Sequence, residues 1–178
     1  MSELLNREQA IELLGELARR LHAWGLEAEI YVVGGTAMAV AYDRARVTRD
    51  IDAVASPAQV VDEIAAQMAE DDTDLSPGWF NQQVATLLPR EFDADQIEAL
   101  SWPGLTVNVA SPRRLLAMKV RAGRSDRDLV DIYVLCQILE LTDIDQVLGI
   151  CNEVWGAGMI REDVVIIVGD YLRSRGLR

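Results

Sequence analysis

Residues that bind soft metals are scarce in this sequence. Its 178 residues include only two cysteines and one histidine. This argues against a disulfide framework and against a zinc site, because each needs several such residues at defined spacings. Cys136 and Cys151 lie in apolar stretches, which predicts buried thiols, and His22 is predicted to lie on the face of a helix.

Long apolar runs are also missing. No run reaches the roughly 18 residues that a membrane-spanning helix needs. The first residues, MSELLNREQAIELL, lack the basic and then apolar order of a signal peptide. We therefore expect a cytoplasmic protein with no membrane partner. The hydrophobic content of 50% and the charged content of 26% are typical of a globular chain.

Positive charge is the third deficit. The formal net charge is -12, which argues against broad, sequence-independent binding of nucleic acid, since neutralising phosphates needs a basic surface. The basic residues gather in two places, so that a local basic rim and solvated helix faces both remain open. The two groups are Arg44, Arg46 and Arg49, and then Arg113, Arg114, Lys119, Arg121, Arg124 and Arg127.

Hydrophobic periodicity predicts a chain of the α/β (α+β) class. We expect a small mixed sheet with flanking helices, followed by a helical C-terminal extension. The core would span residues 1–110, and the helical part, 111–178, would contribute to the same site. Strands are predicted at 28–35, 50–55 and 105–110, and helices at 6–25, 36–43, 57–70, 81–87, 112–122, 125–140, 142–154 and 160–174.

Two short motifs carry the chemistry. Gly34 and Gly35 lie between a predicted strand and a helix, where glycine lets the backbone approach a ligand and the helix presents N–H groups to an anion. Asp50 and Asp52 are two apart on a strand, so their carboxylates share a face with Cα atoms roughly 6.5 Å apart. Oxygen ligands of this kind favour Mg²⁺ or Mn²⁺, which hold nucleotide phosphates. Thr36 is placed to bond a phosphate or to cap the helix.

With the motifs 34-GGT-36 and 50-DID-52, the chain resembles the nucleotidyltransferase superfamily of polymerase-β-like fold. It is most similar there to the AbiEii and MenT group of bacterial toxin nucleotidyltransferases. That likeness rests on a second block, 115-LLAMKVRAGRSDRDLVDIYVL-135, which looks like the group's lysine-bearing helix followed by a helix with arginine and aspartate. The resemblance covers most of residues 30–135.

The resemblance implies a nucleotide site with named residues. Asp50 and Asp52 would bind Mg²⁺ or Mn²⁺, and Lys119 would support the triphosphate of an NTP substrate. Asp128 or Asp131 would complete the catalytic set. The nucleotide-binding residues would be Gly34, Gly35, Thr36, Lys119 and Arg49.

Lys119, Asp128 and Asp131 can also be explained without a catalytic role. Lys119 is the only lysine among 17 basic residues, which indicates a need for a compact ammonium or is a chance product of an arginine-rich composition. Asp128 and Asp131 share a helix face, where Arg124 and Arg127 would allow two weak surface ion pairs.

One position departs from the superfamily pattern. Many of these enzymes carry a third carboxylate on a later strand, where it acts as general base. The strand 105-LTVNVA-110 offers Asn108 instead, and an amide cannot take a proton at neutral pH. We expect the third acid to come from elsewhere, such as the C-terminal helices, or the activity to be low. Trp79, Phe80 and Asn81 either border the site or pack in the core.

The leading functional hypothesis is transfer of an NMP from an NTP to an acceptor hydroxyl. The resemblance implies the toxin of a toxin–antitoxin pair, with a tRNA 3′ end as acceptor and with a kinase-like antitoxin as partner that phosphorylates Thr36. Two alternatives are a nucleotidyltransferase that modifies a small molecule such as an antibiotic, and a catalytically weak protein that binds a nucleotide or a partner.

Overall fold

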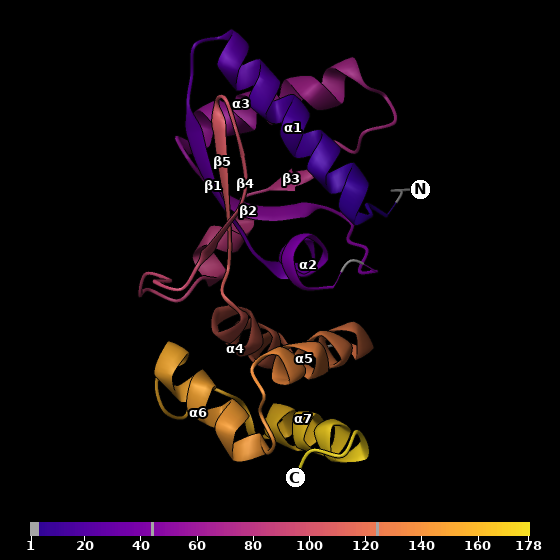
Figure 1. Cartoon of the computed structure of the whole chain (residues 1–178), viewed down its shortest axis with the longest axis vertical. Coiled ribbons are helices and arrows are strands. Elements are labelled where there is room, and N and C mark those ends of the chain that lie inside the picture. The colour runs from indigo at the N-terminus through magenta and orange to yellow at the C-terminus, as the bar shows by residue number, and fades with distance from the viewer. Residues whose placement is uncertain (1–3, 44, 124) are drawn as a thin grey trace. The chain divides into compact units, whose positions relative to one another are not determined.

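The computed structural model describes residues 4–43, 45–123 and 125–178 (Figure 1). The chain divides into two compact units. The first unit extends to Leu88 and includes residues 95–110, and the second consists of residues 89–94 and 111–178. Among the described residues, no helix is both long and apolar enough to cross a membrane.

The first unit is built on a five-stranded mixed sheet. Its strand order is β3-β2-β1-β5-β4, with β1 antiparallel to β2 and parallel to β5. The edge strand β3 runs parallel to β2, and β4 runs antiparallel to β5. The elements are α1 (Arg7–Ala23), β1 (Ala28–Val32), α2 (Gly34–Ala37), the π-helical turn η1 (Met38–Tyr42), β2 (Ile51–Ser56), α3 (Ala58–Asp71), β3 (Phe80–Asn81), the 3₁₀ turn η2 (Gln83–Leu87), β4 (Ile97–Trp102) and β5 (Leu105–Val109).

One face of this sheet forms the core of the first unit. Ile30 of β1 is fully buried and pairs with Ala55 of β2 and Val107 of β5, so that all three side chains point the same way. Helix α1 contacts β5, and helix α3 contacts β2 and α1. The opposite face carries the polar residues of the same strands, and the candidate site lies on that face.

The local sequence explains why α1 begins where it does. The Asn6 side chain accepts from the Gln9 N–H at 2.9 Å, and the Gln9 side chain accepts from the Asn6 N–H at the same distance. This capping box satisfies two N–H groups that a helix start otherwise leaves without partners. The helix predicted over 6–25 is confirmed, with Asn6 as its N-cap.

The second unit is helical. Ser111 caps α4 and Ser125 caps α5, each through a hydroxyl that accepts a backbone N–H. Cys136 and Cys151 are fully buried free thiols, as predicted. Burial raises the pKa of Cys136 to about 11 and the pKa of Cys151 to about 12. The helices are α4 (Pro112–Ala122), α5 (Asp126–Ile138), α6 (Ile144–Trp155) and α7 (Glu162–Ser174).

The predicted fold class is confirmed, and three details differ. Gly34 and Gly35 begin helix α2 instead of ending the strand, because β1 stops at Val32. The helix predicted over 81–87 was wrong at its start, where Asn81 belongs to strand β3. Strand β4 was not assigned from the sequence. It lacks an alternating apolar pattern, since it is an edge strand whose pairing with β5 shifts register between Glu98 and Leu100.

Candidate active site

The two motif aspartates meet at the start of strand β2. Asp52 pairs directly with Asn81 of β3, so both side chains lie on the same side of the sheet. The Asn81 amide donates from Nδ2 to Asp52 Oδ1 at 3.1 Å. Asp50 directly precedes β2, and Asn81 also influences its pKa, so the structure brings both aspartates to the start of this strand, near the Asn81 amide.

The backbone carbonyl of Asp50 is held by two hydroxyls. Thr36 Oγ1 donates to this oxygen at 2.8 Å, and Thr48 Oγ1 donates to it at 3.1 Å. Thr36 is 0% exposed. Its hydroxyl therefore fixes the chain at Asp50 in this conformation, which is a third role beside the phosphate contact and the helix cap expected from the sequence.

Gly34 lies directly under the Asp52 carboxylate. A Cβ atom at this position would be 2.8 Å from Asp52 Oδ2, and the φ of Gly34 is +65°, which L side chains rarely adopt. At Gly35 a Cβ would be 2.8 Å from Thr48 Oγ1. Both glycines are thus required by the packing of the aspartate segment against α2, and the predicted pairing of the two motifs in space is observed.

Burial changes the acidity of one member of the pair. Desolvation raises the pKa of Asp50 above its usual value, against the opposing effects of the nearby Arg49 charge and of the Asn81 hydrogen bond. A half-buried carboxylate of this kind gains from a cation placed beside it. The donor set therefore fits a hard divalent ion, for which one or two carboxylates together with substrate phosphates are an ordinary ligand set.

The raised pKa of Asp50 predicts that Asp50→Asn increases the melting temperature of the metal-free protein at pH 7. The folded chain binds the Asp50 proton more tightly than the unfolded chain does, so the ionised carboxylate lowers stability at neutral pH. That cost disappears as the pH falls through the folded pKa. Thermal melts should therefore show a gain at pH 7 that shrinks to nothing below about pH 4.

Asp95→Asn is the control for this experiment, because Asp95 is an exposed aspartate of the same unit. It should leave the melting temperature nearly unchanged at both pH values. A lower melting temperature for Asp50→Asn at pH 7 would contradict the effect of burial.

Lys119, Asp128 and Asp131 form a second polar cluster, within the helical unit. Lys119 Nζ lies 2.7 Å from Asp131 Oδ2 and 3.1 Å from Asp128 Oδ1. Lys119 is 8% exposed and Asp131 is 1% exposed. The lone lysine thus pairs with a carboxylate that is buried and not at the surface.

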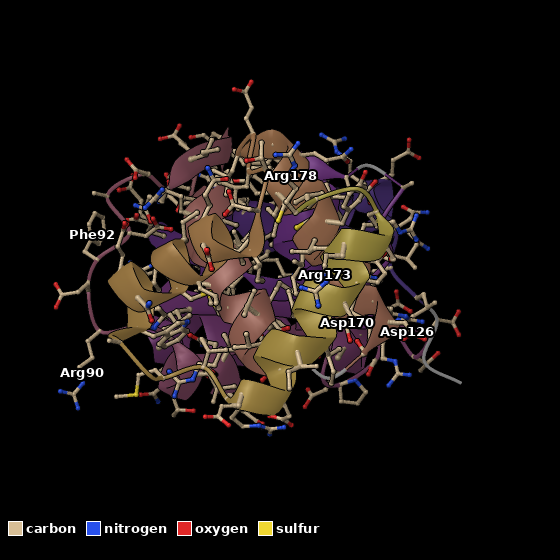
Figure 2. All side chains as sticks on the ribbon, turned by 90° about the horizontal axis from the view of Figure 1, so that it is seen from below. Arg90, Phe92, Asp126, Asp170, Arg173 and Arg178 are labelled. Atoms are coloured by element: carbon tan, nitrogen blue, oxygen red, sulfur yellow. The ribbon has the colours of Figure 1, made fainter. Side chains whose placement is uncertain are left out.

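Most described arginines of the predicted basic rim are engaged inside their own unit. Arg113 pairs with Glu153, the Arg114 guanidinium donates to the Glu91 carbonyl at 2.7 Å, and Arg121 stacks on the Trp155 ring at 4.1 Å. Figure 2 shows similar pairing on α7, where Arg173 binds Asp170. In the first group, Arg46 donates to the Val47 carbonyl at 2.7 Å. Arg44 and Arg124 lie outside the described residues.

Asn108 does not adjoin the aspartate pair. Strand β5 pairs with β1 and β4, whereas the neighbours of β2 are β1 and β3. The Asn108 amide donates to the Glu29 carboxylate instead. The expectation that a third acid comes from elsewhere than β5 stays a prediction, and the side chain presented to Asp52 by the adjacent edge strand is Asn81.

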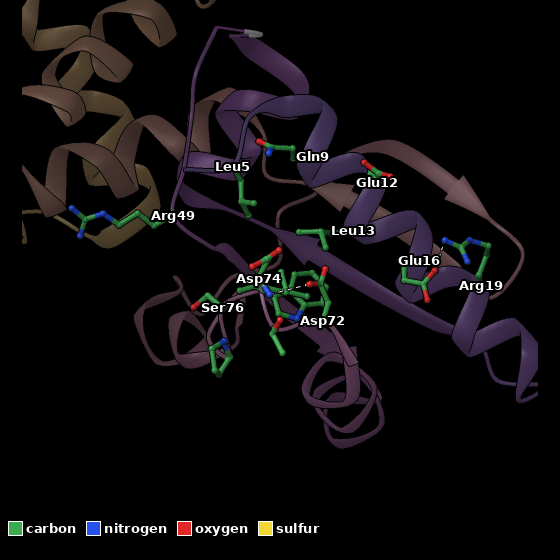
Figure 3. Close-up of a pocket in the computed structure, with 14 residues that line it drawn as sticks. Leu5, Gln9, Glu12, Leu13, Glu16, Arg19, Arg49, Asp72, Asp74 and Ser76 are labelled. Atoms are coloured by element: carbon green, nitrogen blue, oxygen red, sulfur yellow. Dashed lines mark hydrogen bonds and ion pairs between the residues drawn. The ribbon is translucent and has the colours of Figure 1, made fainter. Parts of the chain in front are cut away.

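A groove of about 620 Å³ opens elsewhere on the first unit (Figure 3). It lies between α1 and the loop 72–77, and Arg49 and Trp79 contribute to its wall. Trp79 is 1% exposed, and its indole donates to the Ala65 carbonyl at 3.0 Å, so it belongs to the core. The pocket lining does not include Asp50 or Asp52.

Comparison with protein-family models decides the family. A model described as a nucleotidyltransferase of unknown function (DUF6036) matches residues 9–157. The chain belongs to this family. No curated protein and no solved structure matches it. The nucleotidyltransferase match includes the aspartate pair and the Lys119 cluster, and it ends before helix α7.

This family membership supports nucleotidyl transfer as the general reaction. Nucleotidyl transfer is carried mostly by positioning and by charge around a phosphate group. Within the described residues, no group of three or more Asp, Glu, His or Cys side chains is gathered to hold a metal. In this nucleotidyltransferase a divalent ion at Asp50 and Asp52 would thus take its remaining ligands from the nucleotide and from water.

Proposed function

We propose that this chain is a metal-dependent nucleotidyltransferase that moves an NMP from an NTP to an acceptor hydroxyl. The observation that carries the proposal is the packing of the Asp52 carboxylate against the glycine turn, where a Cβ at Gly34 would lie 2.8 Å from Asp52 Oδ2, with Asp50 two residues earlier in the chain. A divalent ion bound there would orient the phosphates and offset the charge that develops on them. The family match supports nucleotidyl transfer as the reaction class.

The chain's own residues would have separate tasks in this reaction. Asp50 and Asp52 would hold the ion, and the N–H groups that begin α2 would face the phosphates. Thr36 and Thr48 would keep the Asp50 backbone in place through its carbonyl. Lys119 would support the triphosphate, and Asp128 or Asp131 would complete the catalytic set, as the family resemblance implies.

The transfer would proceed by in-line displacement. The acceptor oxygen would bond to the α-phosphorus while the bond from that phosphorus to the bridging oxygen of the β-phosphate breaks, so that pyrophosphate leaves and the acceptor proton passes to water. Asn81 cannot accept this proton, because an amide is not a base at neutral pH. We therefore expect slow turnover, because general base catalysis contributes about 10²–10⁴-fold in rate.

The acceptor that we propose is the 3′ end of tRNA, and the biological role is that of a toxin. The test is expression of the wild type and of Asp52→Ala, with growth and tRNA 3′-end length followed together. Wild type should stop growth while tRNA 3′ ends gain a nucleotide, and Asp52→Ala should do neither. Growth arrest by both proteins, or arrest with unchanged tRNA ends, would contradict the role.

Phosphorylation of Thr36 by a kinase-like antitoxin would switch the enzyme off. A phosphate on Thr36 would add negative charge near two carboxylates and would break the hydrogen bond to the Asp50 carbonyl. Because Thr36 is fully buried, the kinase would have to act on an opened segment. Mass spectrometry after co-expression with the antitoxin should find the modification, and an unmodified Thr36 would count against it.

A cationic small molecule is the second candidate acceptor. The net charge of -12 and the internal engagement of Arg113, Arg114 and Arg121 favour a positively charged substrate over an RNA. Incubation with labelled NTPs and either tRNA or an aminoglycoside panel separates the two. Label should appear in only one of the two acceptors.

A further inference from the structure

The proposed function assigns no role to Asn81, which adjoins the aspartate pair. It lies on the edge strand β3, directly paired with Asp52, and its amide donates to Asp52 Oδ1 at 3.1 Å. Neighbouring carboxylates repel each other when both are ionised. An amide that donates to one of them fixes that carboxylate and offsets part of its charge.

The orientation of the amide follows from its other partner. The Gln83 backbone N–H donates to Asn81 Oδ1 at 3.0 Å, so the amide oxygen is on the side of η2. The NH₂ group must then face the aspartates. Asn81 is therefore arranged as a donor to the Asp52 carboxylate and not as an oxygen ligand for a metal.

The strand that carries Asn81 is anchored on both sides of it. The Trp79 carbonyl accepts from the Ile51 N–H at 2.6 Å, which joins β3 to the aspartate segment. Gln82 accepts from the Ala55 N–H at 2.8 Å and donates to the Asp62 carboxylate at 2.7 Å, which ties the next residue to β2 and α3. Asn81 thus reaches the aspartates from a fixed backbone.

We infer that Asn81 is a positioning residue that sets the Asp52 carboxylate of the metal site before the ion binds. This inference rests on the proposed function, because it assigns the Asp50 and Asp52 pair to a divalent ion. Removing a residue that hydrogen-bonds a metal ligand typically lowers metal affinity by about 10- to 100-fold. Asn81 fits that class, since it donates to Asp52 and its own orientation is fixed by the Gln83 N–H.

The experiment is calorimetric titration of the purified full chain with Mn²⁺ alone. The variants are Asn81→Ala, Asp52→Ala and Asn108→Ala, with melting temperatures measured on the same samples. Asn108 is the matched control, because it is a buried asparagine on a strand of the same unit whose amide contacts Glu29. Asn81→Ala should weaken Mn²⁺ binding about 10- to 100-fold, whereas Asn108→Ala should leave it unchanged.

A second variant covers the case in which Asn81→Ala does not fold. Asn81→Asp keeps an acceptor for the Gln83 N–H and nearly the same shape, but it replaces the two donors with a third carboxylate. Its metal-free form should melt below the wild type, and Mn²⁺ should restore the difference. A metal-free melting temperature equal to that of the wild type would overturn the positioning role.

The outcomes separate this inference from the proposed function. Wild type that binds no Mn²⁺, or that binds it no better than Asp52→Ala, would overturn the metal site itself and the inference with it. Wild-type binding that is lost in Asp52→Ala but kept in Asn81→Ala would leave the metal site standing and would overturn the role of Asn81 alone.

Discussion

Lys119→Met should lower the free energy of unfolding by about 3–5 kcal/mol, because it leaves the Asp131 carboxylate buried without its cation. Asp131 is 1% exposed, and its Oδ2 lies 2.7 Å from the Lys119 ammonium. Methionine has nearly the length of the lysine stem, so the lost packing is small and the lost charge dominates. Denaturant unfolding should show the effect as a lower midpoint with an unchanged slope.

The double variant Lys119→Met with Asp131→Leu tests the cause of that loss. Replacing both buried charges by apolar side chains is often neutral or stabilising, so most of the stability should return. Arg113→Met is the control, since Arg113 pairs with Glu153 at the surface and such pairs contribute about 0–1 kcal/mol. A double variant as unstable as Lys119→Met alone would contradict the buried-charge explanation.

The same double variant separates folding from chemistry. We propose, on the family resemblance, that the Lys119 ammonium supports the triphosphate. The refolded double variant should therefore lose nucleotide transfer although its stability is restored. Transfer at the wild-type rate would show that the Lys119 cluster only holds the helical unit together.

Gly34→Ala should reduce transfer by about 100-fold, because displacing a reacting group by about 1 Å can cost that much. The new methyl group would lie 2.8 Å from Asp52 Oδ2, so the carboxylate or the glycine turn must move. The φ of +65° adds strain, which for an L residue in this region is about 1–2 kcal/mol. Both transfer rate and melting temperature should therefore fall.

Gly78→Ala is the matched control for this substitution. A Cβ at Gly78 would meet no atom within 4 Å, and Gly78 does not have a positive φ. It should leave transfer unchanged and shift stability by no more than about 0.5 kcal/mol. Wild-type transfer by Gly34→Ala would show that Asp52 need not be where the structure places it.

Local chemistry made much of the fold predictable. Caps and apolar periodicity predicted α1 and the four helices of the second unit to within a few residues, because these signals are contained in a short window of sequence. The strand with Asp52 was also predictable from its alternation. These elements depend little on which other segment they pack against.

The role of Asn81 was not predictable in the same way. Its strand has only two residues, and its importance comes from pairing with β2, which is 29 positions earlier in the chain. The sequence left open whether Trp79, Phe80 and Asn81 border the site or pack in the core, because it does not reveal strand order; the structure buries Trp79 and pairs Asn81 with Asp52. The sequence signal that existed was the run 81-NQQ-83, three amides in a row beside a buried tryptophan.

The most direct test of nucleotidyl transfer at the aspartate pair follows the α-phosphate and the γ-phosphate of the NTP separately. Wild type and Asp52→Ala are incubated with Mn²⁺, tRNA and an NTP labelled at the α-phosphate or at the γ-phosphate. We predict that the wild type places the α label on the tRNA and releases the γ label in pyrophosphate, and that Asp52→Ala does neither. Transfer of the γ label to the acceptor, or equal α-label transfer by both proteins, would contradict nucleotidyl transfer at the aspartate pair.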